Sequence, residues 1–453
     1  MTTIRIDAQK KFGKIKKMHA VGQPPFGGGF LQFDFSPIKH LQNANIPYSR
    51  LHDVSYPFGS NRFVDIPNIF RDFDADENDP ASYDFAFTDV LIEALYSYGV
   101  KPVFRLGVSI ENQAHIKSYY IYPPKDFAKW ARICEHVIRH YNEGWADGLH
   151  YGIEYWEIWN EPENRPRVEL NQMWKGTPEE FYELYDVASK HLKSCFGDSI
   201  KVGGYGACEM CGIFYDPEKY GIKFKKDEPD EHYEKYVYRV KFFEGFLEYI
   251  KAHGSPMDFF SWHSYRNVDK TLAMDEYIHR MLCDYGYGDV EIHINEWNNA
   301  PAFKAKAELH GRSIAASSAA AMMIALQNGH ADMLMYYDAK LDASAYGGFF
   351  APLTREPVAT YYSFVAFGRL YTLGTQVETV VDCEKDGFYA LTASDGKKNA
   401  LMIANRTGET QKLNIEGVDL SEASIHVINK NHLLSIAFDK DSIAADDVLL
   451  IEW

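Results

Sequence analysis

The sequence predicts an α/β fold, a (β/α)8 barrel followed by a smaller β-sandwich, and three observations support this. Strand-like and helix-like segments alternate eight times between about residues 17 and 340, which is the count of a (β/α)8 barrel. Past about residue 370, short alternating segments separated by turn residues replace the helices, as in β-sandwiches. The chain has 453 residues, 46% of them apolar, enough for two or three domains with large cores.

The expected barrel strands are short runs of apolar and aromatic residues. They cover residues 19–22, 46–54, 101–107, 155–161, 200–204, 259–265, 291–297 and 333–337. The expected helices have apolar residues at helical spacing. They cover residues 84–99, 125–142, 178–195, 236–253, 270–283 and 312–329. The charged stretch 212–235 is expected to be an insertion or lid.

The expected domains are an N-terminal strand at 1–15, the barrel at 16–365 and the β-sandwich at 366–453. The alternating segment Thr3–Ile6 must pair with other strands, and we expect it to join the C-terminal sheet. The glycines at 27–29 lack the pattern of a phosphate loop and are expected to form a structural turn.

The composition limits the partners of the chain. A net charge of −17 disfavours nucleic acid and anionic membranes, and no run of 18 apolar residues is present that could span a membrane. The N-terminus lacks the pattern of a secretory signal, so we expect a cytoplasmic setting. The six cysteines are scattered and expected to be reduced, and Cys208 and Cys211 lack a second pair to complete a zinc site. The sequence leaves open whether the protein forms a homo-oligomer.

Two strands end in a glutamate beside an asparagine and a tryptophan. The first reads Tyr-Trp-Glu-Ile-Trp and runs into Asn160, Glu161 and Pro162, and the second ends at Glu296. Active sites of parallel barrels lie at the carboxyl ends of the strands. Cleaving a glycosidic bond requires two carboxyl groups, about 5–5.5 Å apart in enzymes that retain anomeric configuration, and requires no metal or cofactor. We therefore expect Glu161 and Glu296 to face each other across a sugar.

The two glutamates are expected to have different roles. The flanking proline and Trp159 would keep Glu161 partly dry and raise its pKa, which suits a general acid and base. Arg50 and Tyr265 would keep Glu296 ionised as the nucleophile. Either glutamate alone is more typical of a salt-bridged surface residue, and the matching pair favours catalysis.

Three tracts together resemble glycoside hydrolase family 39, which contains β-xylosidases and α-L-iduronidases. They are Trp156-Glu157-Ile158-Trp159-Asn160-Glu161-Pro162, Ser49-Arg50-Leu51-His52-Asp53 and Asn295-Glu296-Trp297-Asn298. The resemblance covers residues 17–365 and implies Glu161 as acid and base and Glu296 as nucleophile. It also implies that Arg50 and Tyr265 support the nucleophile and that His52 and Asn160 touch the glycone.

Further substrate contacts are expected from Tyr265 and from His263, Trp297 and Tyr337, although these last three are residue types that also occur in cores. The expected activity is that of a retaining exo-glycosidase, β-xylosidase-like, on short plant-derived oligosaccharides, without metal or cofactor. Related activities stay open: α-L-arabinosidase, β-glucosidase, β-galactosidase, or α-L-iduronidase with Arg165 and Arg167 as a carboxylate clamp. A non-catalytic sugar-binding barrel and a metal-dependent hydrolase are the competing classes, and the second is disfavoured by the lack of paired histidines on the first strand.

Overall fold

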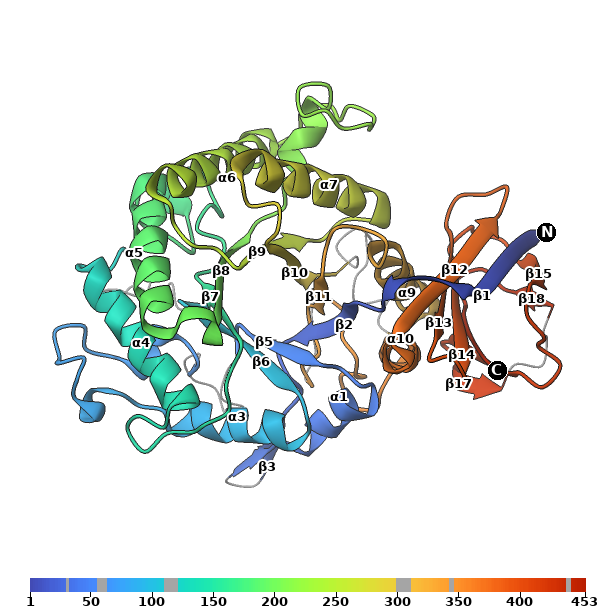
Figure 1. The fold of residues 1–453 in the computed structure, drawn as a ribbon, viewed down its shortest axis with the longest axis horizontal. Helices are drawn as coiled ribbons and strands as arrows, with labels where there is room; N and C mark the ends of the chain where they lie inside the picture. Colours follow the sequence, from blue (N-terminus) through green and yellow to red (C-terminus); the bar gives the residue numbers. More distant parts are fainter. Residues whose placement is uncertain (30–31, 55–62, 110–120, 299–310, 342–345, 437–440) are drawn as a thin grey trace.

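The computed structural model describes the chain except for residues 30–31, 55–62, 110–120, 299–310, 342–345 and 437–440. Within the described residues, eight parallel strands close into a barrel, which confirms the predicted fold class (Figure 1). In chain order the barrel strands are β2 (Lys17–Gly22), β5 (Tyr48–Leu51), β6 (Lys101–Leu106), β7 (Tyr155–Ile158), β8 (Lys201–Ala207), β9 (Phe259–Ser264), β10 (Glu291–Trp297) and β11 (Met333–Tyr336).

The helices described surround the barrel, and they include the six that the sequence predicts. They are α1 (Lys39–Asn43), α2 (Ile66–Ile69), α3 (Ala86–Ser97), α4 (Phe127–Asn142), α5 (Pro178–Phe196), α6 (Tyr233–His253), α7 (Val268–Tyr285), α9 (Ser313–Leu326) and α10 (Ala359–Leu373). Their ends follow local chemistry. The first turn of α5 is closed by a capping box between Thr177 and Glu180, a device that stabilises a helix by about 1 kcal/mol. Gly286 ends α7 in a left-handed conformation.

The interior of the barrel is a packed core. Seven inward-facing side chains form a separate apolar cluster. They are Ala20, Tyr48, Val103, Tyr155, Phe259, Met333 and Met335. The alternate residues of the strands, such as Trp156 and Trp262, point outward and belong to the larger core between strands and helices. Because both faces of the strands are filled, the barrel supports a site only at its ends.

The C-terminal β-sandwich is built from one curled sheet of nine strands (Figure 1). Its strands are β1 (Thr2–Lys14), β12 (Thr375–Asp382), β13 (Phe388–Ser394), β14 (Asn399–Asn405), β15 (Gln411–Glu416), β16 (Ser424–Asn429), β17 (His432–Ile436), β18 (Ser442–Ile443) and β19 (Val448–Glu452). The N-terminal strand β1 pairs with β12 and β15, so it joins this sheet as predicted. The expected domain boundary at residue 365 falls inside α10, which lies with α9 between barrel and sheet.

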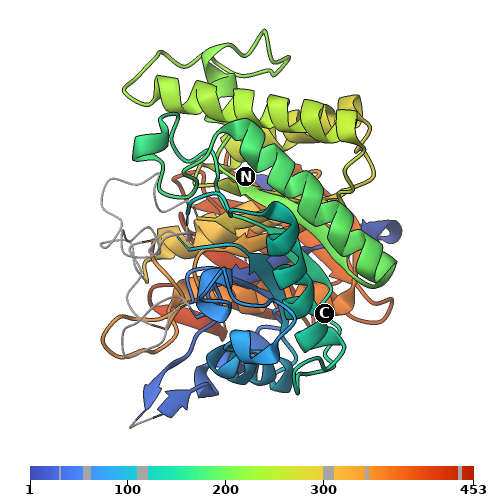
Figure 2. The same ribbon diagram turned by 90° about the vertical axis from the view of Figure 1, so that its left-hand side faces the viewer.

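The charged stretch 212–235 lies outside the ring of helices, beside α6 and α7 (Figures 1 and 2). Its beginning belongs to a buried 3-10 helix, Cys211–Tyr215. Further along, Asp227 forms an ion pair with Lys270 of α7 at 2.5 Å, and the Tyr220 ring packs on Tyr277 of the same helix. These contacts describe a segment docked on the outside of α7, which fits the expected insertion and differs from a lid.

The glycines at 27–29, expected to form a turn, instead form strand β3 (Gly27–Gly29), which pairs antiparallel with β4 (Gln32–Asp34). No helix among the described residues has the length and apolar character needed to cross a membrane. All six cysteines are free.

Candidate active site

Glu161 lies in the loop that follows β7 and does not belong to the strand. The expected strand 155–161 ends at Ile158, because Trp159 and Glu161 have positive φ angles of 72° and 46°. Left-handed backbone costs an ordinary residue roughly 1–3 kcal/mol and is concentrated at functional sites. The buried Trp159 ring donates to the carbonyl of Met173 at 3.0 Å, and the Glu161 amide donates to the carbonyl of Gly206 at 3.0 Å. These bonds fix the loop against its neighbours.

Glu296 lies at the carboxyl end of β10, with its side chain 10% exposed. The hydroxyl of Tyr265 donates to its Oε1, and Nη1 of Arg50 lies 3.4 Å from its Oε2. The structure therefore brings both expected supporting residues to this carboxylate. A phenol and a guanidinium stabilise the ionised form of a carboxyl group, which is the form that a nucleophile needs.

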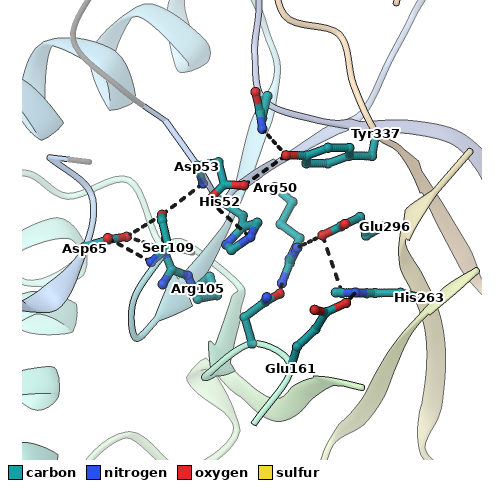
Figure 3. A network of polar contacts seen from close by, with 12 residues as sticks. Arg50, His52, Asp53, Asp65, Arg105, Ser109, Glu161, His263, Glu296 and Tyr337 are labelled. Atoms are coloured by element: carbon teal, nitrogen blue, oxygen red, sulfur yellow. Dashed lines mark hydrogen bonds and ion pairs between the residues drawn. The ribbon is translucent and has the colours of Figure 1, made fainter. Parts of the chain in front are cut away.

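His263 of β9 lies between the two glutamates (Figure 3). Its Nδ1 is 2.8 Å from Oε1 of Glu161, and its Nε2 is 3.7 Å from Oε2 of Glu296. Asn164 donates from Nδ2 to the other oxygen of Glu161 at 2.7 Å. One carboxylate oxygen of each glutamate and a ring nitrogen of His263 all lie within 4.8 Å of one another. The two acids, 135 residues apart in the sequence, thus face a single point.

A buried polar network holds Arg50 in place. Nε of Arg50 donates to Glu157 at 2.7 Å and Nη2 donates to Oδ1 of Asn160 at 2.6 Å. Glu157 is fully buried and also accepts from Ser261 at 2.6 Å and from Asn295. A buried ion pair requires such additional hydrogen bonds to offset the loss of hydration. The network therefore fixes the arginine and the asparagine that flank the two glutamates.

A tyrosine and an aspartate close the side of the site near β5 and β11 (Figure 3). The Tyr337 hydroxyl donates to Asp53 at 2.9 Å and accepts from Nε2 of Gln23 at 2.7 Å. Nε2 of His52 is 3.3 Å from Asp53, whose amide donates to Ser109 at 3.2 Å. The expected residues His52 and Tyr337 thus belong to one network beside Arg50.

Trp297, expected to pack on a sugar, lies in the core instead. Its side chain is fully buried, and its ring packs on Tyr336 and on Phe364 of α10. The expected role of this residue is therefore corrected: it fills the space between barrel and helices.

Sequence reasoning missed three residues at the site. Glu157 could have been found, because a charged residue stands in the middle of an aromatic strand. Tyr346 gave no signal; its ring lies 5.2 Å from those of both Tyr265 and Tyr337. Gly206 also gave none. A methyl group there would lie 3.0 Å from Asn160, 3.1 Å from Arg50 and 3.3 Å from His263.

The pKa of Glu161 differs from the expectation. Burial raises it, but the hydrogen bond and charge of His263 outweigh burial and lower the pKa to about 2. Burial likewise lowers the pKa of His263, but the charges of Glu296 and Glu161 raise it overall. These opposite shifts in pKa favour a proton on His263, between the two carboxylates. Glu163, fully buried two residues on, has its pKa raised to about 7 by burial.

Glu161, His263 and Glu296 present oxygen and nitrogen atoms close enough to hold a metal ion. However, the two carboxylates already have polar partners in the protein. His263 contacts both, and Arg50 and Tyr265 contact Glu296. Two carboxyl groups that converge in this way can cleave a glycosidic bond without a metal.

An eight-stranded barrel with two glutamates converging at the carboxyl ends of its strands defines the class of glycoside hydrolases that use paired carboxyl groups. The comparison with protein families gives the particular member of that class. The model described as "Glycosyl hydrolases family 39" matches residues 2–338, and the chain belongs to this family.

Similar proteins include two curated β-xylosidases and a solved glucosidase. The β-xylosidase of Geobacillus stearothermophilus is 27% identical over 165 residues, 34% of this chain and 30% of the relative. That of Caldicellulosiruptor saccharolyticus is 24% identical over 235 residues, 49% of this chain and 42% of the relative. The matches thus span less than half the length of these relatives. The crystal structure of a glucosidase from Croceicoccus marinus has a TM-score of 0.72 and 21% identity, covering 100% of this chain and 98% of the other, which shows the shared fold.

Proposed function

We propose that this protein is a retaining exo-glycosidase of β-xylosidase type that acts on short plant-derived oligosaccharides by double displacement. Glu161 is the general acid and base, and Glu296 is the nucleophile. The supporting groups are Arg50 and Tyr265 at the nucleophile and His263 at the acid.

The observation that carries this proposal is the short separation of the two carboxylates. Their nearest oxygens lie within 4.8 Å of each other through the His263 group. Retaining enzymes place the two carboxyl groups about 5–5.5 Å apart, whereas inverting enzymes need about 6.5–9.5 Å to admit a water molecule. The short separation matches the spacing of retaining enzymes, so it supports a covalent glycosyl-enzyme intermediate.

In the first step, an oxygen of Glu296 attacks the anomeric carbon while the glycosidic oxygen leaves with a proton. The proton comes through Glu161. His263 Nδ1 is within hydrogen-bond distance of that carboxylate and holds the proton in the free protein. As Glu296 forms the ester bond it loses its charge, which weakens one of the two anions that raise the pKa of His263 while the leaving group departs. The proton is then more readily transferred to Glu161 and on to the leaving group.

In the second step, Glu161 accepts a proton from water, and the resulting hydroxide attacks the same carbon and releases Glu296. Asn160, held by Arg50 at 2.6 Å, is placed to hydrogen-bond the hydroxyl next to the anomeric carbon. His52 and Tyr337 bind other hydroxyls of the glycone. Tyr346, with Tyr265 and Tyr337, offers ring surface against the C–H face of a sugar.

The two curated relatives named β-xylosidase support xylose as the glycone. Of the two arginines expected as a carboxylate clamp for an α-L-iduronidase, Arg167 is exposed at the surface and only Arg165 is half-buried, so this alternative has less support. A panel of aryl glycosides tests the choice: β-xyloside, α-L-arabinoside, β-glucoside, β-galactoside and α-L-iduronide. The β-xyloside should be cleaved fastest, and activity on none of the five would favour a non-catalytic sugar-binding barrel. Exo action predicts that a xylose tetramer gives xylose and the trimer, and no dimer, at early times.

Substitution of the two glutamates tests their roles. Glu161→Ala should slow cleavage of unactivated substrates by about 10²–10⁴-fold yet spare aryl substrates with good leaving groups, with azide restoring turnover. Glu296→Ala should be inactive on all substrates, and a 2-fluoro glycoside should label Glu296 in the unmodified protein. Glu154→Gln is the matched control, because Glu154 precedes the opposite end of the same strand and pairs with Lys201 there.

Two further measurements separate the competing classes. NMR of the first product should show the anomeric configuration of the substrate, and inversion would reject the covalent intermediate. Full activity in chelator is expected, and loss of activity there would favour a metal-dependent hydrolase. The six free cysteines support the proposal that the protein works in the reducing cytoplasm.

A further inference from the structure

Away from the barrel mouth, three side chains with metal-binding atoms converge where α4 packs against α5 (Figure 1). Glu135 belongs to α4, and His191 and Cys195 belong to α5. Residues four apart on a helix share one face, so the histidine and the cysteine both point toward α4. All three residues are half-buried, which leaves the cluster within reach of ions in solution.

The ligand atoms surround one point. Nε2 of His191 lies 2.6 Å from Oε2 of Glu135 and 3.8 Å from Sγ of Cys195. Tetrahedral zinc with bonds of about 2.0–2.3 Å places its ligand atoms roughly 3.3–3.6 Å apart. An ion would therefore require the carboxylate to move back by roughly 0.7 Å from the histidine, a change within the freedom of a glutamate side chain.

We propose that Glu135, His191 and Cys195 form a binding site for a dication of the zinc class, which ties α4 to α5 on the outer face of the barrel. A thiolate and an imidazole favour zinc and similar transition metals, whereas magnesium and calcium take oxygen ligands. With one thiolate and one carboxylate the site balances the charge of a dication. Three protein ligands leave the fourth position to water.

Arg139 orients the carboxylate of Glu135 as a metal ligand. Its Nε donates to Oε1 of Glu135 at 2.7 Å, and its guanidinium lies 5.0 Å from the centre of the Phe196 ring. The arginine thus holds one oxygen and leaves the other, Oε2, directed at the histidine. Outer partners of this kind orient the ligands of known metal sites.

Binding requires a change of protonation. Burial, together with the charge of Glu135, raises the pKa of the Cys195 thiol, so the ion displaces that proton to water. His191 binds through Nε2 in its neutral form, with its remaining proton on Nδ1. Affinity should therefore rise with pH, as for other sites with a cysteine ligand.

Cobalt is a suitable probe, because Co²⁺ bound to a thiolate absorbs by charge transfer from sulfur. Titrating Co²⁺ into the reduced full-length protein should give this absorption with a stoichiometry of one. Cys195→Ser should abolish it, and Glu135→Gln should weaken binding by at least about 10-fold, since even the loss of an outer partner costs 10–100-fold. Zn²⁺ should displace the cobalt and raise the unfolding temperature of the unmodified protein but not of Cys195→Ser.

The chain provides a matched control on α7. His279 and Cys283 have the same spacing and a similar Nε2 to Sγ distance of 3.7 Å. No carboxylate of the described residues completes a three-ligand group with them. Cys283→Ser should leave the cobalt absorption unchanged. Absence of absorption in the unmodified protein, or its persistence in Cys195→Ser, would overturn the proposal and leave His191 and Glu135 as an ion pair only. His191→Asn, which keeps the cysteine, provides a second variant should Cys195→Ser fail to fold.

Discussion

Gly206 of β8 offers the sharpest test of how the site depends on backbone shape. Its φ angle is +59°, a left-handed conformation that glycine adopts without strain. Its carbonyl accepts from the amide of Glu161, and its amide donates to Ser261 at 2.9 Å. Gly206→Ala keeps both backbone bonds and adds one methyl group, which would point directly at the side chains that surround the two glutamates.

Two costs follow from the structure. The left-handed backbone costs an alanine roughly 1–2 kcal/mol. In addition, contacts of 3.0 Å to Asn160, 3.1 Å to Arg50 and 3.3 Å to His263 require these groups to move by a few tenths of an ångström. A misplacement of 1 Å costs about 10²-fold in rate, so we expect a loss of roughly 10-fold in kcat/KM beyond the effect of backbone strain.

Gly152→Ala is the matched control. Gly152 has a φ of +62°, close to that of Gly206, but a methyl group there meets nothing within 4 Å. Both variants should lose thermal stability through backbone strain, and Gly206→Ala should lose at least as much as Gly152→Ala. Only Gly206→Ala should lose activity on the best aryl glycoside of the panel. Unchanged kcat/KM in Gly206→Ala, or an equal loss in both variants, would refute the claim that this glycine is required by the site.

Three further predictions concern charge. His263→Asn removes the group that lowers the pKa of Glu161 from 4.5 to about 2. This lowered pKa contributes at most about 3 kcal/mol to the free energy of unfolding, which is present above pH 4.5 and lost toward pH 2. Unfolding temperatures between pH 3 and 7 should therefore fall less steeply on acidification in the variant than in the unmodified protein. Glu163→Gln should stabilise the protein increasingly from pH 5 to 8, because burial raises this pKa from 4.5 to about 7 and ionisation then destabilises the folded state; an unchanged pH profile would contradict this. Arg50→Met leaves Glu157 buried without its cation and should lower the free energy of unfolding by about 3–5 kcal/mol. Because Glu157→Gln removes the unpaired charge, thermal unfolding should show the double variant to be more stable than Arg50→Met alone.

The architecture could be predicted because it depends on periodicity. Apolar runs of strand length alternate with helical patterns, and this alternation alone leads to the barrel, while the change of pattern near residue 370 leads to the C-terminal sheet. The end of β7 could not be found in this way. Trp159 continues the aromatic pattern of a strand, and nothing in the residue types reveals its left-handed backbone.

The pair Glu161 and Glu296 could be predicted because strand ends of a parallel barrel meet at one rim. Their protonation could not. The expectation of a dry, raised Glu161 considered only its neighbours in sequence, whereas His263 approaches from β9, 102 residues away. The raised pKa predicted for Glu161 is found instead at Glu163, which is fully buried and accepts a hydrogen bond from the Cys208 amide.

The position of Trp297, which differs from the expectation, is explained by an irregularity in β10. Along this strand His293 and Asn295 face the barrel axis, where they contact Glu291 and Glu157, so strict alternation would place Trp297 inward and Glu296 outward. The pairing of β10 with β9 shifts register between Ile294 and Glu296, and its pairing with β11 shifts between Ile294 and Trp297. Such an irregularity re-aims side chains near active sites. The same shift that turns the carboxylate of Glu296 toward Glu161 therefore turns the tryptophan into the core, and a sequence period of two cannot reveal it.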